Sequence, residues 1–286
     1  MVVLALEQSK KHIEDIQGEI SHWQTKVDNL SSEYMKEKEE NIHLKCEIQE
    51  VSQQLQLQSD YLVHLGASSC TLLWRVSRCE ESIEAIIGGT KVDDFLSLVS
   101  TTLNSFLQTY DNPEEDTDSE ETQFILALCG TITNIAASAF GREFLMTNQN
   151  GHLVMDTFLH ALSELKLGQC TKMKQLILMC MYNVSINQKG GRHIINHPGI
   201  IGLLVWLLQG EKASDIVLQL IRLIHSLICE QGNPKILHEV NEVLSDQLVQ
   251  QLAADRNKEI SQATIEMMSD IRVLKFPPLE QCRDMR

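Results

Sequence analysis

Two asparagines stand at matching places in two similar stretches of sequence. Asn134 lies in the stretch LCGTITNIA, and Asn183 lies in ILMCMYNVS. Each asparagine has apolar residues six and two places before it and one place after it. A side-chain amide can donate to a carbonyl and accept from an N–H, so it can hold the main chain of an extended peptide whatever the peptide's side chains are. The chemistry that this pattern indicates is peptide binding.

Both asparagines belong to stripes of small or polar residues at four-residue steps, which is the spacing of one helix face. The stripes are Gly130, Asn134 and Ser138 in the first stretch, and Met179, Asn183 and Asn187 in the second. We predict that these faces line a peptide-binding groove. The alternative is that the two asparagines only satisfy the ends of helices.

Other reactive constellations are weak in this chain. His193 and His197 stand four residues apart, but no third ligand lies at metal-binding spacing and Pro198 ends the expected helix. The eight cysteines are scattered, without a Cys-x-x-Cys pair. No phosphate-binding glycine loop, Gly-x-Ser-x-Gly elbow or His-Glu-x-x-His motif is present. We therefore expect no catalytic residue, no metal, no cofactor and no enzymatic activity.

Short helices must position the asparagines. Only 5 Pro and 14 Gly occur in 286 residues, which favours an all-α fold. From about residue 68 the apolar spacing predicts short helices, whose short connections place neighbours antiparallel. The expected breaks are Gly88-Gly89, 111–121, 148–151, Gly168, 189–191, 209–212 and 231–234. The acidic run 111–121 is most simply a solvated loop; the alternatives are a docking strip for a basic partner or a phosphorylated loop at Thr117 or Ser119.

The asparagine stretches mark a repeat. Asn134 and Asn183 lie 49 residues apart, and a glycine, Gly141 or Gly190, follows each of them seven residues later. A third copy has Ser226 in the place of the asparagine, 43 residues after Asn183. The first period slightly exceeds the roughly 40 to 47 residues of armadillo and HEAT units, so we expect one longer loop.

This pattern resembles the armadillo family, in which the third helix of each repeat carries Asn-Leu-Ser-like residues. A Gly turn and a Leu-Val-x-Leu-Leu helix open the next repeat there, much like residues 203–208 here. The resemblance implies a superhelix whose concave face is lined by third helices, with the asparagine holding a partner peptide. Nuclear import receptors carry Trp four places before the asparagine, whereas this chain has Gly130 and Met179. A receptor for basic import signals is therefore disfavoured.

Five further strings resemble the heat shock factor 2-binding protein family, a family of meiotic adaptors, over about residues 60 to 275. They are GASSCTLLW (66–74), FGREFL (140–145), GQCTKMK (168–174), YNVSIN (182–187) and VWLL (205–208). The resemblance implies a germ-cell protein of the nucleus and meiotic chromosomes, with some in the cytoplasm. In its armadillo groove it would bind a peptide of the breast cancer type 2 susceptibility protein, and so help to localise recombinases to DNA double-strand breaks during meiotic homologous recombination.

The same resemblance implies a second meiotic partner at the N-terminal helix and heat shock factor 2 as a further partner. It also adds Arg142 and Tyr182 to the groove. Arg142 follows Asn134 at an eight-residue step, where a forked cation could hold peptide carbonyls or a carboxylate.

The first 65 residues carry a heptad pattern typical of a coiled coil. Its predicted seam contains Ile13, Ile16, Ile20, Trp23, Val27, Leu30, Asn41, Leu44, Ile48, Val51 and Leu55. Such spacing winds helices left-handedly around one another, over roughly 80 Å here. A parallel dimer is favoured, although Glu37 and Asn41 form a soft place where a partner helix could join. The alternative is one amphipathic helix packed on the globular domain. We predict a coiled-coil oligomerisation helix at 1–65 and an armadillo-like domain at 66–286.

The net charge of −15 repels phosphate backbones, so no direct contact with nucleic acid is expected. The first residues lack a basic leader, and no run of 18 apolar residues follows, so we expect an intracellular protein without a membrane partner. A rival hypothesis is a purely structural oligomer, in which the coiled coil is the function and the repeats form a cap.

Overall fold

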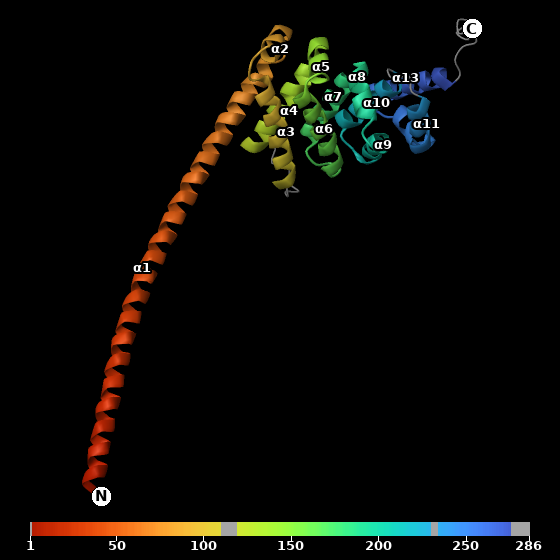
Figure 1. Cartoon of the computed structure of the whole chain (residues 1–286). Coiled ribbons are helices and arrows are strands. Elements are labelled where there is room, and N and C mark those ends of the chain that lie inside the picture. The colour runs from red at the N-terminus through yellow and green to blue at the C-terminus, as the bar shows by residue number, and fades with distance from the viewer. Residues whose placement is uncertain (1, 110–118, 230–233, 276–286) are drawn as a thin grey trace. The chain divides into compact units, whose positions relative to one another are not determined.

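Figure 1 shows a computed structural model of the chain, which describes residues 2–109, 119–229 and 234–275. Over these residues it contains helices and no strands, so the all-α prediction is confirmed. The helices are α1 (Val2–Val76), α2 (Glu80–Ile87), α3 (Val92–Thr109), α4 (Glu120–Ala137), α5 (Ala139–Leu145), α6 (Gln149–Glu164), α7 (Thr171–Ser185), α8 (Gln188–Ile195), α9 (Ile200–Gly210), α10 (Ser214–Cys229), α11 (Pro234–Val243), α12 (Asp246–Ala253) and α13 (Lys258–Lys275).

The chain divides into two compact units, at residues 1–62 and 63–286. The first unit is the greater part of α1, a helix without proline that continues past residue 65 to Val76. The apolar side chains of the predicted seam are exposed along it in the single chain; Val27, for example, is 62% exposed. The structure shows the helix, and its association with a second helix stays a prediction.

The second unit is a stack of three-helix repeats. Helices α4, α7, α10 and α13 pack side by side in that order, and we call them the third helices. Two helices lie between each third helix and the next along the chain, and outside the row of third helices α3 packs on α6 and α11 on α9. Figure 1 shows α2 to α13 following one another along this stack. The predicted armadillo-like repeat is confirmed.

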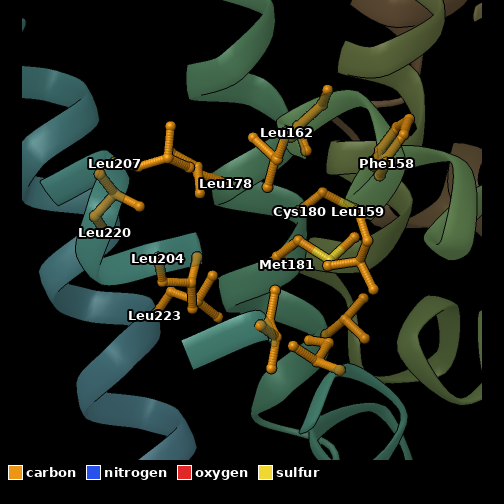
Figure 2. Packing of buried hydrophobic residues seen from close by; sticks show 14 of the residues in the cluster. Phe158, Leu159, Leu162, Leu178, Cys180, Met181, Leu204, Leu207, Leu220 and Leu223 are labelled. Carbon is orange, nitrogen blue, oxygen red and sulfur yellow. The ribbon is translucent and has the colours of Figure 1, made fainter. Parts of the chain in front are cut away.

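One continuous apolar core runs through the stack. Figure 2 shows buried side chains of this core, among them Phe158 and Leu162 of α6, Met181 of α7, Leu204 of α9 and Leu223 of α10. All five side chains are fully buried. Because every repeat contributes to the same core, each third helix is fixed against its neighbours and the face that it presents is well defined.

The turns after α4 and α7 follow the repeat of the sequence. Ser138 caps α5 by accepting a hydrogen bond from Gly141 N, and Asn187 caps α8 by accepting one from Gly190 N. A Cβ on either glycine would clash with a carbonyl oxygen of the preceding third helix. Glycine is therefore required at both places because the backbones approach closely.

Several predicted breaks differ in detail from the structure. The predicted break at 189–191 was wrong, because these residues lie inside α8. The glycines there allow the close turn that precedes the helix, and they do not end a helix. The breaks at 148–151 and 209–212 are shorter than predicted, because α6 begins at Gln149 and α9 continues to Gly210. Most of the acidic run lies outside the described residues. Of its last three residues, Ser119 caps α4 by accepting from Thr122 N, and Glu120 and Glu121 form the start of α4.

A buried ion pair fixes the connection between α6 and α7. Lys174 Nζ lies 2.5 Å from Glu211 Oε1, and the two side chains are 0% and 1% exposed. Lys174 also donates to Lys166 O at 2.6 Å, and the Glu211 carboxylate accepts from Gly168 N. Gly168 adopts the left-handed region at φ 76°, which glycine tolerates without strain. The Lys174–Glu211 pair thus holds the connection between α6 and α7, which has no regular secondary structure.

Within the described ranges no single helix is both long and apolar enough to cross a membrane. Helices α4 and α5 meet that test only as a pair, and they are bent by 113° with respect to each other.

Candidate peptide-binding groove

The two asparagines and Ser226 occupy equivalent places on three successive third helices. Asn134 lies on α4, Asn183 on α7 and Ser226 on α10. Helix α4 packs on α7 and α7 packs on α10, and each is the third helix of its repeat. Equivalent positions on these helices therefore lie on one face of the stack. This is the face on which the sequence placed the groove.

A hollow of about 900 Å³ opens on this face between α7, α10 and α13. Its lining carries both signs of charge and some apolar surface, and includes Tyr182, Ile186, Arg222, His225, Ser226, Lys258, Gln262, Glu266 and Asp270. Amides, charges of both signs and an aromatic ring together suit the main chain and mixed side chains of a peptide.

A smaller hollow of about 500 Å³ lies at the other end of the face. Its lining includes Arg78, Glu80, Asn134, Ser138 and Ala139. Asn183 stands on the third helix between the helix of Asn134 and the helix of Ser226, so it lies between the two hollows along the face.

Asn134 is bound to its own chain. Its amide nitrogen donates to Trp74 O at 3.0 Å and to Ser77 Oγ at 2.9 Å. These bonds use both amide hydrogens and satisfy groups at the C-terminal end of α1. The indole ring of Trp74 also covers Gly130, where a Cβ would clash with it. Gly130 is therefore buried beneath Trp74, and it does not line an open groove.

Asn183 is much less engaged. Its amide nitrogen lies 3.5 Å from Thr133 O, at the limit of a hydrogen bond, and the side chain is half-buried. Tyr182, its neighbour on α7, lines the larger hollow, and Met179 is half-buried one turn before. Of the two repeated asparagines, Asn183 is thus the one whose amide can turn to a peptide at little cost.

The family is decided by comparison with known proteins. The model of the heat shock factor 2-binding protein ARM-like domain matches residues 64–189 and 198–276. Heat shock factor 2-binding protein of Mus musculus is 38% identical over 275 residues, which cover 96% of this chain and 80% of the mouse protein. The chain belongs to the heat shock factor 2-binding protein family. Its resemblance to this family in the sequence is confirmed.

The solved structures that match this chain include engineered proteins of low sequence identity. One is 14% identical with a TM-score of 0.47 and covers 72% of this chain and 91% of its own. Another is 13% identical with a TM-score of 0.42 and covers 73% and 90%.

In this member of the heat shock factor 2-binding protein family, the polar stripes do not continue along single helices as predicted. Helix α4 ends at Ala137 and α7 ends at Ser185, so Ser138 and Asn187 belong to the turns that follow. Both residues cap the next helix, as their side-chain oxygens accept from backbone N–H groups there. The four-residue step thus ends at the helix end in each repeat.

Arg142 also binds its own backbone. Its Nη1 atom donates to Ala137 O at 2.8 Å and to Ala136 O at 3.2 Å, which caps the last carbonyls of α4. The predicted contact of Arg142 with a peptide stays a prediction.

Nearby, Glu143 of α5 forms an ion pair with Lys189 and accepts a hydrogen bond from Asn187 at 3.0 Å. Lys189 and then Asn187 hold the pKa of the Glu143 carboxyl below its usual range. This cross-link ties the first helices of two successive repeats together.

The remaining candidate ligands and thiols have structural surroundings. His193 Nε2 pairs with Asp156 at 2.8 Å, and His193 Nδ1 lies 3.2 Å from His152 Nδ1. Because His197 lies beyond the end of α8, His193 and His197 share no helix face. Burial raises the pKa of the Cys129 thiol to about 12 and also raises that of Cys180. These two thiols are core residues.

Four residues of the face were not predicted from the sequence: Trp74 and Ser77 at one end, and Lys258 and Asp270 at the other. These residues come from the end of α1 and from α13, far along the chain from the asparagines. The aromatic ring in the string GASSCTLLW was the only local signal for the first pair.

Proposed function

We propose that this chain is a non-enzymatic meiotic adaptor that binds a peptide segment of the breast cancer type 2 susceptibility protein along its third helices. Through that contact it would help to localise recombinases to DNA double-strand breaks in meiotic homologous recombination. The place of action would be the nucleus, on meiotic chromosomes, with some protein in the cytoplasm. The observation that carries the proposal is the hollowed face of mixed charge beside the weakly engaged amide of Asn183.

The binding mode follows from the donors and acceptors on that face. An extended segment has an unpaired N–H and C=O at each residue, and the Asn183 amide can satisfy one of each. Arg222 and Lys258 can receive acidic side chains of the segment, and Glu266 can receive a basic one. Nothing in this arrangement calls for a nucleophile or a proton-transfer group.

The N-terminal part of α1 would supply the oligomeric state. Its exposed apolar seam is stabilised when a second helix covers it, so we propose a homo-oligomer, which holds several grooves in one particle. A second meiotic partner would join this helix, and the seam is softest at Glu37 and Asn41.

Contact with DNA would be indirect in this scheme. A chain with a net charge of −15 gains nothing from releasing the counterions of a phosphate backbone. The adaptor would therefore reach breaks through its protein partners.

A second function is favoured by the name of the mouse relative, which describes that protein as binding heat shock factor 2. We propose that this chain also binds heat shock factor 2, as a regulator of that transcription factor. The rival, a purely structural oligomer, predicts no peptide ligand at all.

The test is a binding array of overlapping peptides that covers the breast cancer type 2 susceptibility protein and heat shock factor 2, probed with the full chain. The expected result is a short run of consecutive peptides retained by the wild type and lost with Asn183→Ala. Retention of no peptide from either protein would support the structural oligomer. A run that survives Asn183→Ala and Arg142→Ala together would mean that the peptide binds on another surface.

A further inference from the structure

Three side chains with metal-binding atoms meet at the edge of the larger hollow. His225 and Cys229 stand four residues apart on α10, and Asp270 lies on the neighbouring α13. His225 Nε2 is 2.8 Å from Asp270 Oδ2, and the ligand atoms of all three lie within 4.8 Å of one another. The cluster is within the described residues of both helices.

The three atoms form a donor set that zinc favours. Imidazole nitrogen, thiolate sulfur and carboxylate oxygen bind Zn²⁺ at about 2.0 to 2.3 Å, in tetrahedral geometry. At these bond lengths neighbouring ligand atoms stand about 3.3 to 3.7 Å apart. In the structure His225 Nε2 and Asp270 Oδ2 are 2.8 Å apart, and no two of the three ligand atoms are more than 4.8 Å apart. Rotation of the side chains can change these distances by about 1 Å, which brings them into the range of a zinc site.

The backbone favours the same arrangement. A four-residue step on α10 brings the His225 and Cys229 side chains to one face of the helix, and that face packs on α13. The side chains of His225 and Asp270 are 26% and 53% exposed, so an ion can enter from solvent without an opening of the core.

We propose that His225 Nε2, Cys229 Sγ and an Asp270 carboxylate oxygen bind one zinc ion between α10 and α13. On binding, the Cys229 thiol loses its proton to solvent and the sulfur becomes an anionic ligand, so the affinity rises with pH. Three protein ligands leave the fourth position open, as in zinc sites that keep a water or bind an outside ligand.

The open position has a consequence for the hollow. His225, Cys229 and Asp270 all belong to its lining, as does Glu266 of α13. A water or a carboxylate in the hollow can therefore complete the tetrahedron. The ion would tie α13 to α10 at the end of the stack, and its two positive charges would be balanced by the Cys229 thiolate and the Asp270 carboxylate. The inference is independent of the proposed function, since it needs no peptide.

A hydrogen-bonded His225–Asp270 pair without metal is the competing explanation, and metal binding to the full chain distinguishes the two. The probe is Zn²⁺ alone, or Co²⁺ as its spectroscopic substitute, added to reduced, metal-free protein. We expect one tightly bound equivalent, a thiolate-to-cobalt absorption band in the near ultraviolet, and a rise in melting temperature with added zinc.

Matched variants assign the site. Cys229→Ser and Asp270→Asn should each weaken zinc binding at least tenfold, and Cys229→Ser should remove the cobalt band. Cys46→Ser, an exposed thiol on α1, and His238→Gln, from an exposed histidine–carboxylate pair on α11, should change neither. Cys229→Ser is nearly isosteric, so it tests the ligand without disturbing the fold.

The proposal is overturned if the wild type shows no cobalt band and no tight zinc equivalent. It is overturned equally if Cys229→Ser and Asp270→Asn bind zinc as tightly as the wild type, since the ion would then lie elsewhere. If either variant has a lower melting temperature without metal, the cobalt band and the number of zinc ions bound are measured at a temperature where the variant is folded, and these two results decide the question.

Discussion

The amide nitrogen of Asn134 donates a hydrogen bond to the backbone carbonyl of Trp74 at 3.0 Å, across 60 residues of sequence. Asn183, its equivalent in the next repeat, reaches Thr133 O only at 3.5 Å. The same residue type at the same place in two repeats therefore has two roles. In the first repeat it holds the end of α1, and in the second we propose that its amide binds a peptide.

Asn134→Ala should lower the free energy of unfolding by about 1 to 3 kcal/mol. The substitution removes two hydrogen bonds, each contributing about 0.5 to 1.5 kcal/mol, while the buried Ser77 hydroxyl keeps its bond to the Trp74 carbonyl. Chemical denaturation of the full chain measures it. Asn183→Ala is the matched control and should change stability by less than half as much. Equal losses in the two variants would contradict the division of roles.

Gly130→Ala should destabilise the repeat domain, although alanine is the better helix former by about 1 kcal/mol. The added Cβ would clash with the indole of Trp74 and displace it from α4. Gly202→Ala is the control, because a Cβ there meets nothing within 4 Å and should stabilise α9. Thermal melting should move in opposite directions for the two variants. A stabilising Gly130→Ala would show that Trp74 does not need this contact.

Lys174→Met should destabilise the domain by about 3 to 5 kcal/mol, because it leaves the Glu211 carboxylate buried without its cation. The double variant Lys174→Met with Glu211→Leu should recover much of that loss, since no unpaired charge remains. Denaturation curves of wild type, single and double variants form the test. If the single variant is as stable as the wild type, the pair is hydrated in solution and does not fix the connection between α6 and α7.

Ile20→Asp combined with Val27→Asp should reduce the full chain from an oligomer to a monomer, because a carboxylate buried in the seam loses hydration without gaining a partner. Light scattering gives the mass. Thr25→Asp combined with Ser32→Asp places the same charges on the opposite side of the heptad and should leave the oligomer intact. A wild type that is monomeric at micromolar concentration would show that the exposed seam does not self-associate and binds a helix of another protein instead.

Local sequence signals were sufficient for the architecture. Gly141 and Gly190 are required by close turns, and Ser138 and Asn187 are helix caps, so all four act within a few residues of their own position. Their 49-residue repetition could therefore be recognised without knowing the tertiary fold.

The roles within the site could not be predicted in the same way. Whether Asn134 faces solvent or the end of α1 depends on Trp74, and whether His225 has a partner depends on Asp270, 45 residues further along the chain. Such contacts arise only when third helices stack. The continuation of the stripe to Ser138 and Asn187 failed for a simpler reason, because the helices end one residue before it in the first case and two in the second.

The most direct test of the peptide groove is calorimetry of the full chain with the best-retained segment of the breast cancer type 2 susceptibility protein. Asn183→Ala should weaken binding about tenfold to a hundredfold, which corresponds to the roughly 1 to 3 kcal/mol of one lost amide contact, with an unchanged melting temperature. Gln149→Ala, which removes an exposed amide from α6, should bind like the wild type. Wild-type affinity of a correctly folded Asn183→Ala variant would contradict the account.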